Sequence, residues 1–128
     1  MLSLWLSASL GSPESLILAP GVVQISQETR LTPMSVHLVR LDEADIRERM
    51  RQLPDWTTDG EYLFYTRTFD GFVEAVAFVN SLVEPAEQLG HHPDITISYN
   101  QVLIELTTHD AQGLTELDFQ LAAQISQL

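Results

Sequence analysis

"EQLGHHPDITISYNQVLIELTTHD", residues 87–110, contains two β-rich runs separated by a short polar junction. Apolar residues alternate with other residues in both runs: Ile95, Ile97 and Tyr99 in the first, and Val102, Ile104 and Leu106 in the second. A period of two is typical of a strand with one buried face. With a turn at residues 99–101, this stretch predicts a β-hairpin, and the segments on either side of it determine how the hairpin is covered.

A helical pattern precedes this hairpin. Asp70 is placed to cap a helix with an apolar stripe at a spacing of three to four residues: Phe72, Val76, Val79 and Val83. Pro93 disfavours the helical conformation in the residue before it, so we expect this helix to end near Gly90.

A second helical pattern follows the hairpin and runs to the end of the sequence. Thr115 and Asp118 have the spacing of a capping box, in which two side chains satisfy backbone N–H groups at the start of a helix. The expected buried stripe of this helix consists of Leu117, Leu121 and Ile125.

Upstream of residue 70, the sequence has the same arrangement of a helix followed by a hairpin. Asp42 is a candidate N-cap for a helix over residues 42–53, which carries Ile46, Met50 and Leu53 and which Pro54 ends. Asp59-Gly60 between two β-rich runs predicts a tight hairpin turn. The order α-β-β-α-β-β-α predicts an α+β two-layer domain, with a four-stranded antiparallel sheet and three helices on one face.

The first 33 residues differ in texture from the rest. They contain apolar patches interrupted by Gly11, Pro13, Pro20 and Gly21. These patches are too short to span a bilayer. A signal peptide would require basic residues near its start, and none precedes Arg30. We expect residues 1–33 to be a loose extension outside the fold and residues 34–128 to be the folded domain. The alternative is that residues 16–25 add a strand or pack on the domain.

The charge and composition exclude several classes of function. Eighteen acidic residues against six basic ones give a formal net charge of −12, and there is no cysteine. Such a surface repels phosphate backbones and lacks a basic stretch for anionic lipid, so we expect no nucleic-acid and no membrane partner. Without cysteine there can be no disulfide, thiolate ligand or thiol nucleophile, which fits a cytoplasmic protein.

Three of the four histidines lie in the stretch that opens this section. Glu87 and His91 are four residues apart, so their side chains can meet on one face of a helix. If the hairpin turns at Asn100, residues whose numbers sum to 200 or 201 face each other, and His91 and His92 then lie opposite His109 within one residue. We therefore expect the three imidazoles to converge at one end of the sheet.

Three interpretations of this cluster remain open on the residues alone. A zinc site could use His91, His109 and Glu87, but adjacent residues of an extended chain point to opposite faces and the helical HExxH spacing is absent. Acid–base chemistry suits imidazole, whose pKa of about 6.5 allows it to give and take protons near neutrality. Alternatively, His92 or His109 merely caps or packs.

The cluster also belongs to a longer pattern. Glu87, His91-His92-Pro93, Tyr99, His109 and Asp118 occur in the order and at the spacings of a known signature. From about residue 41 to residue 128, the sequence resembles the pterin-4a-carbinolamine dehydratase family (4a-hydroxytetrahydrobiopterin dehydratases).

The resemblance implies a specific activity and a set of roles. The family's enzymes are lyases that remove water from a 4a-hydroxytetrahydropterin, giving quinonoid dihydropterin in tetrahydrobiopterin recycling, without a metal or redox cofactor. It implies that His91 and His109 transfer protons and that His92 chiefly holds the pterin. Glu87 would orient His91, and Tyr99 and Asp118 would be supporting residues. The remaining substrate-binding residues would be Pro93, Thr108, Asp110 and Ala111.

The resemblance also implies partners. We expect a homodimer or homotetramer, the pterin as the small-molecule substrate, and a pterin-dependent hydroxylase in the same pathway. Some relatives act instead as non-catalytic transcriptional coactivators or Rubisco assembly factors, and such a binding role is the alternative. Those specialised relatives tend to lose the histidines that this chain retains, which favours the enzyme.

Overall fold

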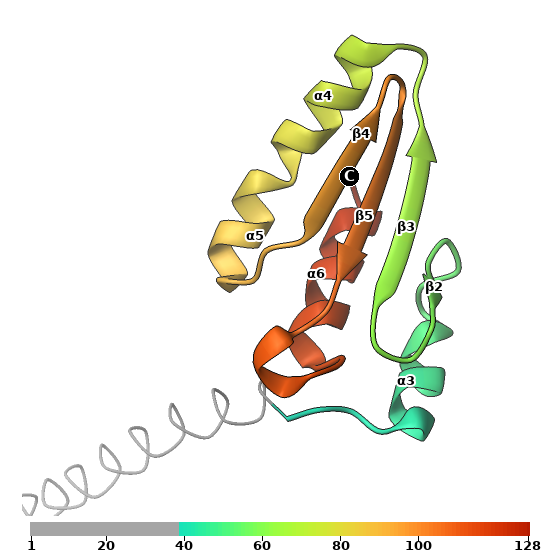
Figure 1. Cartoon of the computed structure of the whole chain (residues 1–128), viewed down its shortest axis with the longest axis vertical. Helices are drawn as coiled ribbons and strands as arrows, with labels where there is room; N and C mark the ends of the chain where they lie inside the picture. Colours follow the sequence, from blue (N-terminus) through green and yellow to red (C-terminus); the bar gives the residue numbers. More distant parts are fainter. Residues whose placement is uncertain (1–38) are drawn as a thin grey trace, which may run out of the picture. The chain divides into compact units, whose positions relative to one another are not determined.

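The computed structural model describes residues 39–128 of the chain (Figure 1). The predictions for residues 1–33, including a strand at residues 16–25, lie outside the described residues. The elements in chain order are α3 (Glu43–Met50), β2 (Thr57–Thr58), β3 (Leu63–Thr68), α4 (Phe72–Ser81), α5 (Val83–Leu89), β4 (Asp94–Ser98), β5 (Gln101–Leu106), the 3-10 helix η1 (His109–Ala111) and α6 (Glu116–Ser126).

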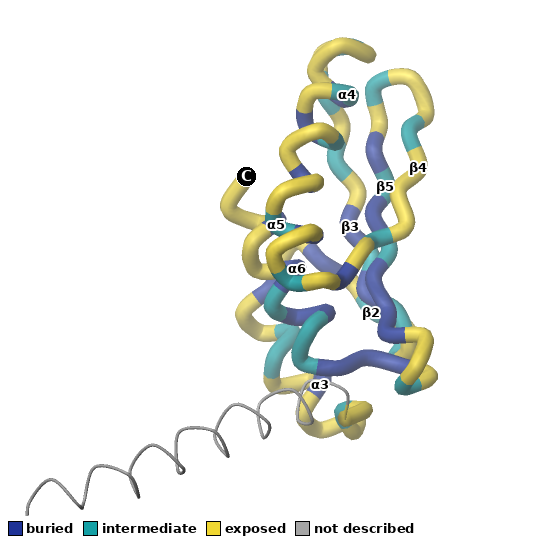
Figure 2. The backbone as a smooth tube through the Cα atoms, turned by 90° about the vertical axis from the view of Figure 1, so that its left-hand side faces the viewer, coloured by how far each residue is buried: buried dark blue, intermediate teal, exposed yellow. Residues whose placement is uncertain are grey.

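The four strands form one antiparallel sheet in the order β2-β3-β5-β4. Both predicted hairpins are present, because β2 pairs with β3 and β4 pairs with β5. Figure 2 shows the helices gathered on one side of the sheet. The predicted α+β fold with a four-stranded antiparallel sheet is confirmed.

The register of the β4–β5 hairpin differs from the prediction. Residues whose numbers sum to 199 face each other, as Ile97 and Val102 do, rather than those that sum to 200 or 201. The turn contains only Tyr99 and Asn100, and Tyr99 takes a positive φ of 53° to close it. A two-residue hairpin turn of this kind needs a residue in the left-handed region, and sequence spacing alone did not reveal that tyrosine would supply it.

The hydrophobic core lies between the helices and one face of the sheet. The sheet contributes Leu63, Tyr65, Val102, Ile104 and Leu106, which are all buried. The helical layer contributes Ile46, Ala75, Phe78, Leu82, Phe119, Leu121, Ala122 and Ile125. Full burial of a Leu, Ile or Phe side chain contributes about 1.5–3 kcal/mol, so this face fixes which way each strand presents its side chains.

The helix predicted between Asp70 and Gly90 is interrupted at Leu82. Pro85 explains the interruption, because proline has no N–H to donate to the carbonyl of Ser81 and its ring crowds that carbonyl. Asp70 does not cap α4 either: Gly71 is the N-cap residue and no side chain bonds to the helix start.

The buried face of α4 also differs from the predicted stripe. Ala75 and Phe78 face the core, whereas Phe72 and Val83 of the expected stripe are 54% and 59% exposed. Val76 and Val79 are half-buried. The sequence of α4, FVEAVAFVNS, is apolar on more than one face, so periodicity did not select the side that packs on the sheet.

The capping predictions for the other two helices are confirmed. Asp42 accepts a hydrogen bond from the backbone N–H of Asp45 at 2.8 Å, and Thr115 and Asp118 form a capping box. The first helix ends at Met50 rather than at residue 53. In the last helix Leu121 and Ile125 are fully buried, as expected, but Leu117 is only half-buried.

The turn between β2 and β3 is held by the Asp59 side chain. Its Oδ1 accepts hydrogen bonds from the backbone N–H groups of Glu61 and Tyr62, both at 2.9 Å, and Gly60 takes a φ of 100°. These two backbone donors lower the pKa of the Asp59 carboxyl, because they stabilise its charged form.

We predict that Asp59→Ala lowers the free energy of unfolding at pH 7. The folded-state pKa of Asp59 lies below its ordinary value of 3.8, so the carboxylate's contribution is present above that pH. The contribution is lost as the pH falls through the folded-state pKa, so the difference between variant and parent narrows there. Urea unfolding followed by circular dichroism from pH 7 to pH 3 measures this, with the exposed Asp55→Ala as control. A difference that grows in acid would contradict the prediction.

Candidate functional site

His91 reaches the interior of the domain because of how α5 ends. Gly90 adopts the left-handed conformation with a φ of 62°, and the N–H of His91 then bonds back to the carbonyl of Ala86 at 3.1 Å. This C-terminal motif, which glycine favours, turns the chain sharply out of the helix. The side chain of His91 is buried, and its Nε2 lies 2.6 Å from Oδ1 of Asp118.

Asp118 is fully buried and its carboxylate is surrounded by donors. Besides His91 at Oδ1, the hydroxyl of Thr108 donates to Oδ2 at 2.7 Å, and the backbone N–H of Thr115 donates to Oδ2 at 2.9 Å. Burying a carboxylate is unfavourable unless such bonds compensate it. We call His91, Thr108, Thr115 and Asp118 the Asp118 network; it joins the exit of α5, the end of β5 and the start of α6.

His92 lies in a different environment from its neighbour. Its Nε2 is 2.6 Å from Oε1 of Glu87, and the two side chains are 61% and 68% exposed. The expectation that Glu87 orients His91 is therefore wrong, because Glu87 contacts His92 instead. The i, i+4 rule fails here because the helix ends at Leu89 and Gly90 reverses the local handedness before His91.

His109 is exposed and begins η1 directly after Thr108. A small loop holds it in place: the N–H of Thr108 bonds to the carbonyl of Gly113 at 3.1 Å, and the reverse bond is 3.3 Å. Asp110 is exposed and Ala111 is half-buried in the same loop. The ladder between β4 and β5 stops at Asp94 and Glu105, so the predicted pairing of His91 or His92 with His109 does not occur as strand pairing.

The structure nevertheless connects the two histidine-bearing loops. His91 and Thr108 bond to the two oxygens of one carboxylate, and His109 is the next residue after Thr108. Among residues 39–128, no group of three or more His, Cys, Asp or Glu side chains is placed to hold one metal ion.

Two expected site residues occupy other positions. The hydroxyl of Thr108 points inward to Asp118 rather than toward a substrate rim. Tyr99 is at the β4–β5 turn and is 68% exposed, at the opposite end of β4 from His91. Five strand residues span about 16 Å, so Tyr99 does not contribute to the histidine site within this chain.

The sequence pattern indicated only a capping role for Thr115, but its side chain also belongs to the site. The Oγ1 of Thr115 lies 2.7 Å from Oγ1 of Thr108, and both residues are buried. A capping-box residue preceded by an apolar Leu114 and followed by a buried helix face is the sequence signal that could have predicted this burial.

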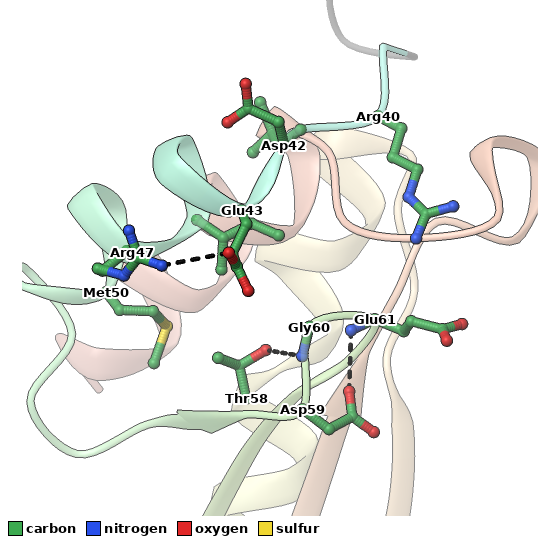
Figure 3. Close-up of a pocket in the computed structure, with 11 residues that line it drawn as sticks. Arg40, Asp42, Glu43, Arg47, Met50, Thr58, Asp59, Gly60 and Glu61 are labelled. Atoms are coloured by element: carbon green, nitrogen blue, oxygen red, sulfur yellow. Dashed lines mark hydrogen bonds and ion pairs between the residues drawn. The ribbon is translucent and has the colours of Figure 1, made fainter.

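A separate pocket of about 700 Å³ lies away from the histidines, between α3 and the β2–β3 turn (Figure 3). It is lined by Arg40, Leu41, Asp42, Glu43, Ile46, Arg47, Met50, Thr58, Asp59, Gly60 and Glu61. Arg47 is already paired with Glu43 at 3.3 Å, and Asp59 is occupied by the backbone of its own turn. This lining contains no histidine.

Comparison with known proteins identifies the family of this chain. The family model described as pterin 4 alpha carbinolamine dehydratase matches residues 39–128. A protein of Trichormus variabilis, provisionally named a pterin-4-alpha-carbinolamine dehydratase, is 58% identical over 88 residues, which are 69% of this chain and 95% of that protein. One from Thermomicrobium roseum with the same provisional name is 47% identical over 91 residues, covering 71% of this chain and 98% of that protein.

A solved structure is also similar. The structure of a transcriptional coactivator/pterin dehydratase from Brucella melitensis superposes with a TM-score of 0.65 at 34% sequence identity, covering 69% of this chain and 96% of that one. The fold and site are thus those of a small α+β domain with histidines on two adjoining loops. The chain belongs to the pterin 4 alpha carbinolamine dehydratase family.

Within residues 39–128, the structure contains no helix with the length and apolar character that crossing a membrane requires.

The two histidine–carboxylate pairs should differ strongly in their effect on stability. Asp118→Ala leaves the ring of His91, the Thr108 hydroxyl and the Thr115 N–H without their acceptor, and breaking a buried pair typically costs about 3–5 kcal/mol. Glu87→Ala breaks an equally short but exposed pair, which is worth about 0–1 kcal/mol. Urea unfolding followed by circular dichroism compares them. Equal losses for the two variants would refute the assignment of Asp118 as the buried centre of the network.

Proposed function

We propose that this protein is a dehydratase that converts a 4a-hydroxytetrahydropterin into quinonoid dihydropterin and water. The observation that carries the proposal is the buried hydrogen bond between His91 and Asp118 at 2.6 Å, beside the loop that carries His109. Family membership supports the substrate class. This arrangement provides one histidine with a fixed ring and one exposed histidine on an adjoining loop.

The reaction needs one base and one acid. The base takes the proton from N5 of the pterin, and the N5–H bonding pair forms the new double bond between N5 and C4a. The bond from C4a to its hydroxyl oxygen breaks, and the oxygen takes the bonding pair of that C4a–O bond and a proton from the acid, and leaves as water. The pterin is neither oxidised nor reduced, so the step requires no redox cofactor, and imidazoles can serve as both acid and base near pH 7.

We assign these two proton transfers to His91 and His109. The ring of His91 is fixed by Asp118, which limits the reorganisation needed to reach a reactive geometry. His109 is exposed and precedes the short loop of Asp110 and Ala111, where a substrate can reach it.

Binding of the pterin is assigned to the neighbouring residues. His92 and the half-buried Pro93 lie directly beside His91, on the outer side of the chain. Glu87 holds the exposed ring of His92 at 2.6 Å, so it acts on substrate binding rather than on His91.

We further propose that the protein is a homodimer or homotetramer that uses the outer face of α4. Phe72 and Val73 of α4 are 54% and 75% exposed, and a hollow lined by Phe72, Val73, Val76, Ala77 and Asn80 runs along α4. A contiguous apolar patch of this kind is typical of an interface. A second copy of the chain is the occupant that the family resemblance implies.

Loss of either proton-transferring histidine should abolish most of the activity. General acid–base contributions are typically about 100- to 10,000-fold, so His91→Ala and His109→Ala should each lower kcat and kcat/KM together. The assay follows the carbinolamine absorbance produced in situ by a pterin-dependent hydroxylase. Because neighbouring imidazoles can replace one another, the double variant is the decisive measurement, and turnover within a few-fold of the parent would refute the assignment.

The binding residues should give a different kinetic signature. His92→Ala should mainly raise KM, because a contact that holds the pterin stabilises the ground state and the transition state alike. Glu87→Gln should raise KM by less, since the imidazole remains. A chelator should leave the activity of the parent unchanged, and inactivation by the chelator with recovery on addition of zinc would favour a metal mechanism instead.

Self-association should depend on the apolar face of α4. Val73→Glu places a charge in the proposed interface, where it would be desolvated, so we expect dissociation to monomers at concentrations where the parent is oligomeric. Size-exclusion chromatography with light scattering measures the molar mass. Val39→Glu is a matched control, because Val39 is 57% exposed but lies outside α4. An oligomer that survives the Val73 change unaltered would locate the interface elsewhere.

A further inference from the structure

The Thr115 side chain is fully buried at the start of α6, where it forms a capping box with Asp118 and also bonds to the hydroxyl of Thr108. Its Oγ1 lies 2.7 Å from Oγ1 of Thr108, which in turn donates to Oδ2 of Asp118 at 2.7 Å. Thr115 cannot contact a substrate from this position. Any effect of its hydroxyl on the chemistry has to reach His91 through Asp118, either by way of Thr108 or through the capping box.

Counting the available hydrogens gives the hydrogen bonds from Thr115 through Thr108 to Asp118 a single direction. A threonine hydroxyl has one hydrogen to donate, and that of Thr108 is used on Asp118. The hydroxyl of Thr115 must therefore donate to Thr108. The backbone N–H of Thr115 also bonds to Oδ2 of Asp118, at 2.9 Å, so Thr115 supports the carboxylate both directly and through Thr108.

The same count determines which ring nitrogen of His91 carries a hydrogen. An ionised carboxylate can only accept hydrogen bonds, so Nε2 of His91, which lies 2.6 Å from Oδ1, must carry a hydrogen. Within residues 39–128, no hydrogen bond is made to Nδ1 of this ring. The partner of one ring nitrogen thus determines which of the two is left for chemistry.

We propose that Thr115 is a positioning residue: its hydroxyl begins a one-way chain through Thr108 and Asp118 that keeps the hydrogen of His91 on Nε2 and leaves Nδ1 as the atom that exchanges protons with the substrate. The part that concerns substrate rests on the dehydratase function proposed above. The part that concerns the hydrogen-bond chain is a property of the free protein and can be tested without substrate.

This chain of hydrogen bonds matters because either oxygen of Asp118 could accept a hydrogen bond from His91. With both donors on Oδ2, only Oδ1 is available to His91, and the ring has one way to satisfy the carboxylate. Without the Thr115 hydroxyl, Thr108 loses the donor to its own oxygen and can rotate to a new partner. Asp118 then loses a polarised donor, and the orientation of His91 is less strictly set.

The first measurement uses the free, full-length parent. Two-dimensional NMR that correlates the ring nitrogens of histidine with its carbon-bound protons identifies which nitrogen carries hydrogen in the neutral ring, and a His91→Gln spectrum assigns the signals. We expect a hydrogen on Nε2 and none on Nδ1. A neutral His91 with its hydrogen on Nδ1 would overturn the proposal, and this reading requires no substitution in the chain of hydroxyls.

The second measurement removes the Thr115 hydroxyl at nearly constant volume. Thr115→Val should shift the ring signals of His91 and lower kcat about threefold to tenfold with little change in KM, which is the scale of one buried hydrogen bond. Thr115→Ser retains a hydroxyl and should restore both readings. The matched control is Thr107→Val, because Thr107 is also buried and adjacent to Thr108 but donates to the carbonyl of Glu61 at 2.7 Å.

The outcomes separate this proposal from the dehydratase assignment. Unchanged His91 ring signals in Thr115→Val, with kcat within twofold of the parent, would overturn the positioning role. Equal ring shifts in Thr107→Val would also overturn it, by showing a general response to a lost buried hydroxyl. A parent without dehydratase activity would refute the proposed function, while the ring signals of the parent and of Thr115→Val would still decide whether the chain of hydroxyls sets His91.

Discussion

The rest of the site depends on the need to satisfy one buried carboxylate. Asp118 has no exposed surface, and an ionised carboxylate without hydrogen-bond donors in such a place would cost several kcal/mol. Its three donors come from the exit of α5, the end of β5 and the first residue before α6. These segments are far apart in the sequence, so satisfying Asp118 requires that the helical layer and the sheet meet in one arrangement. The same bonds that join these segments therefore fix the position of His91.

The network also explains why the three histidines of the cluster have different properties. His91 is buried and bonded to a buried carboxylate, whereas His92, the next residue, and His109, on the adjoining loop, are exposed. The bond between His92 and Glu87 is as short as that between His91 and Asp118, yet water screens the exposed pair and the buried pair is hardly screened. One imidazole is thus held rigidly, and two can adapt to a ligand. The proposed dehydratase function would use both kinds, because it requires a planar ring to be held and protons to be transferred.

Much of the fold followed from local patterns, and the differences have identifiable causes. The Asp42 cap, the Asp59-Gly60 turn and the capping box of Thr115 and Asp118 were predicted because each depends on a few adjacent residues. The buried face of α4 was not, because its apolar residues cover more than one side and only the sheet selects between them. The predicted contact between Glu87 and His91 does not occur, because the prediction extended helical spacing across Gly90, where the backbone is left-handed. The partner of His91 lies 27 residues away, and local spacing carries no information about it.

Asp118 shows why the structural and functional interpretations of this residue are compatible. As the third residue of α6, it accepts the N–H of Thr115 and lies where the helix macrodipole favours a negative charge. Those interactions stabilise the carboxylate, and its second oxygen remains available to His91. A capping residue in most helices uses this remaining capacity on water. Here the helix start is buried against β5 and the exit of α5, so the capacity is directed to an imidazole, and the end of a helix becomes the orienting part of a site.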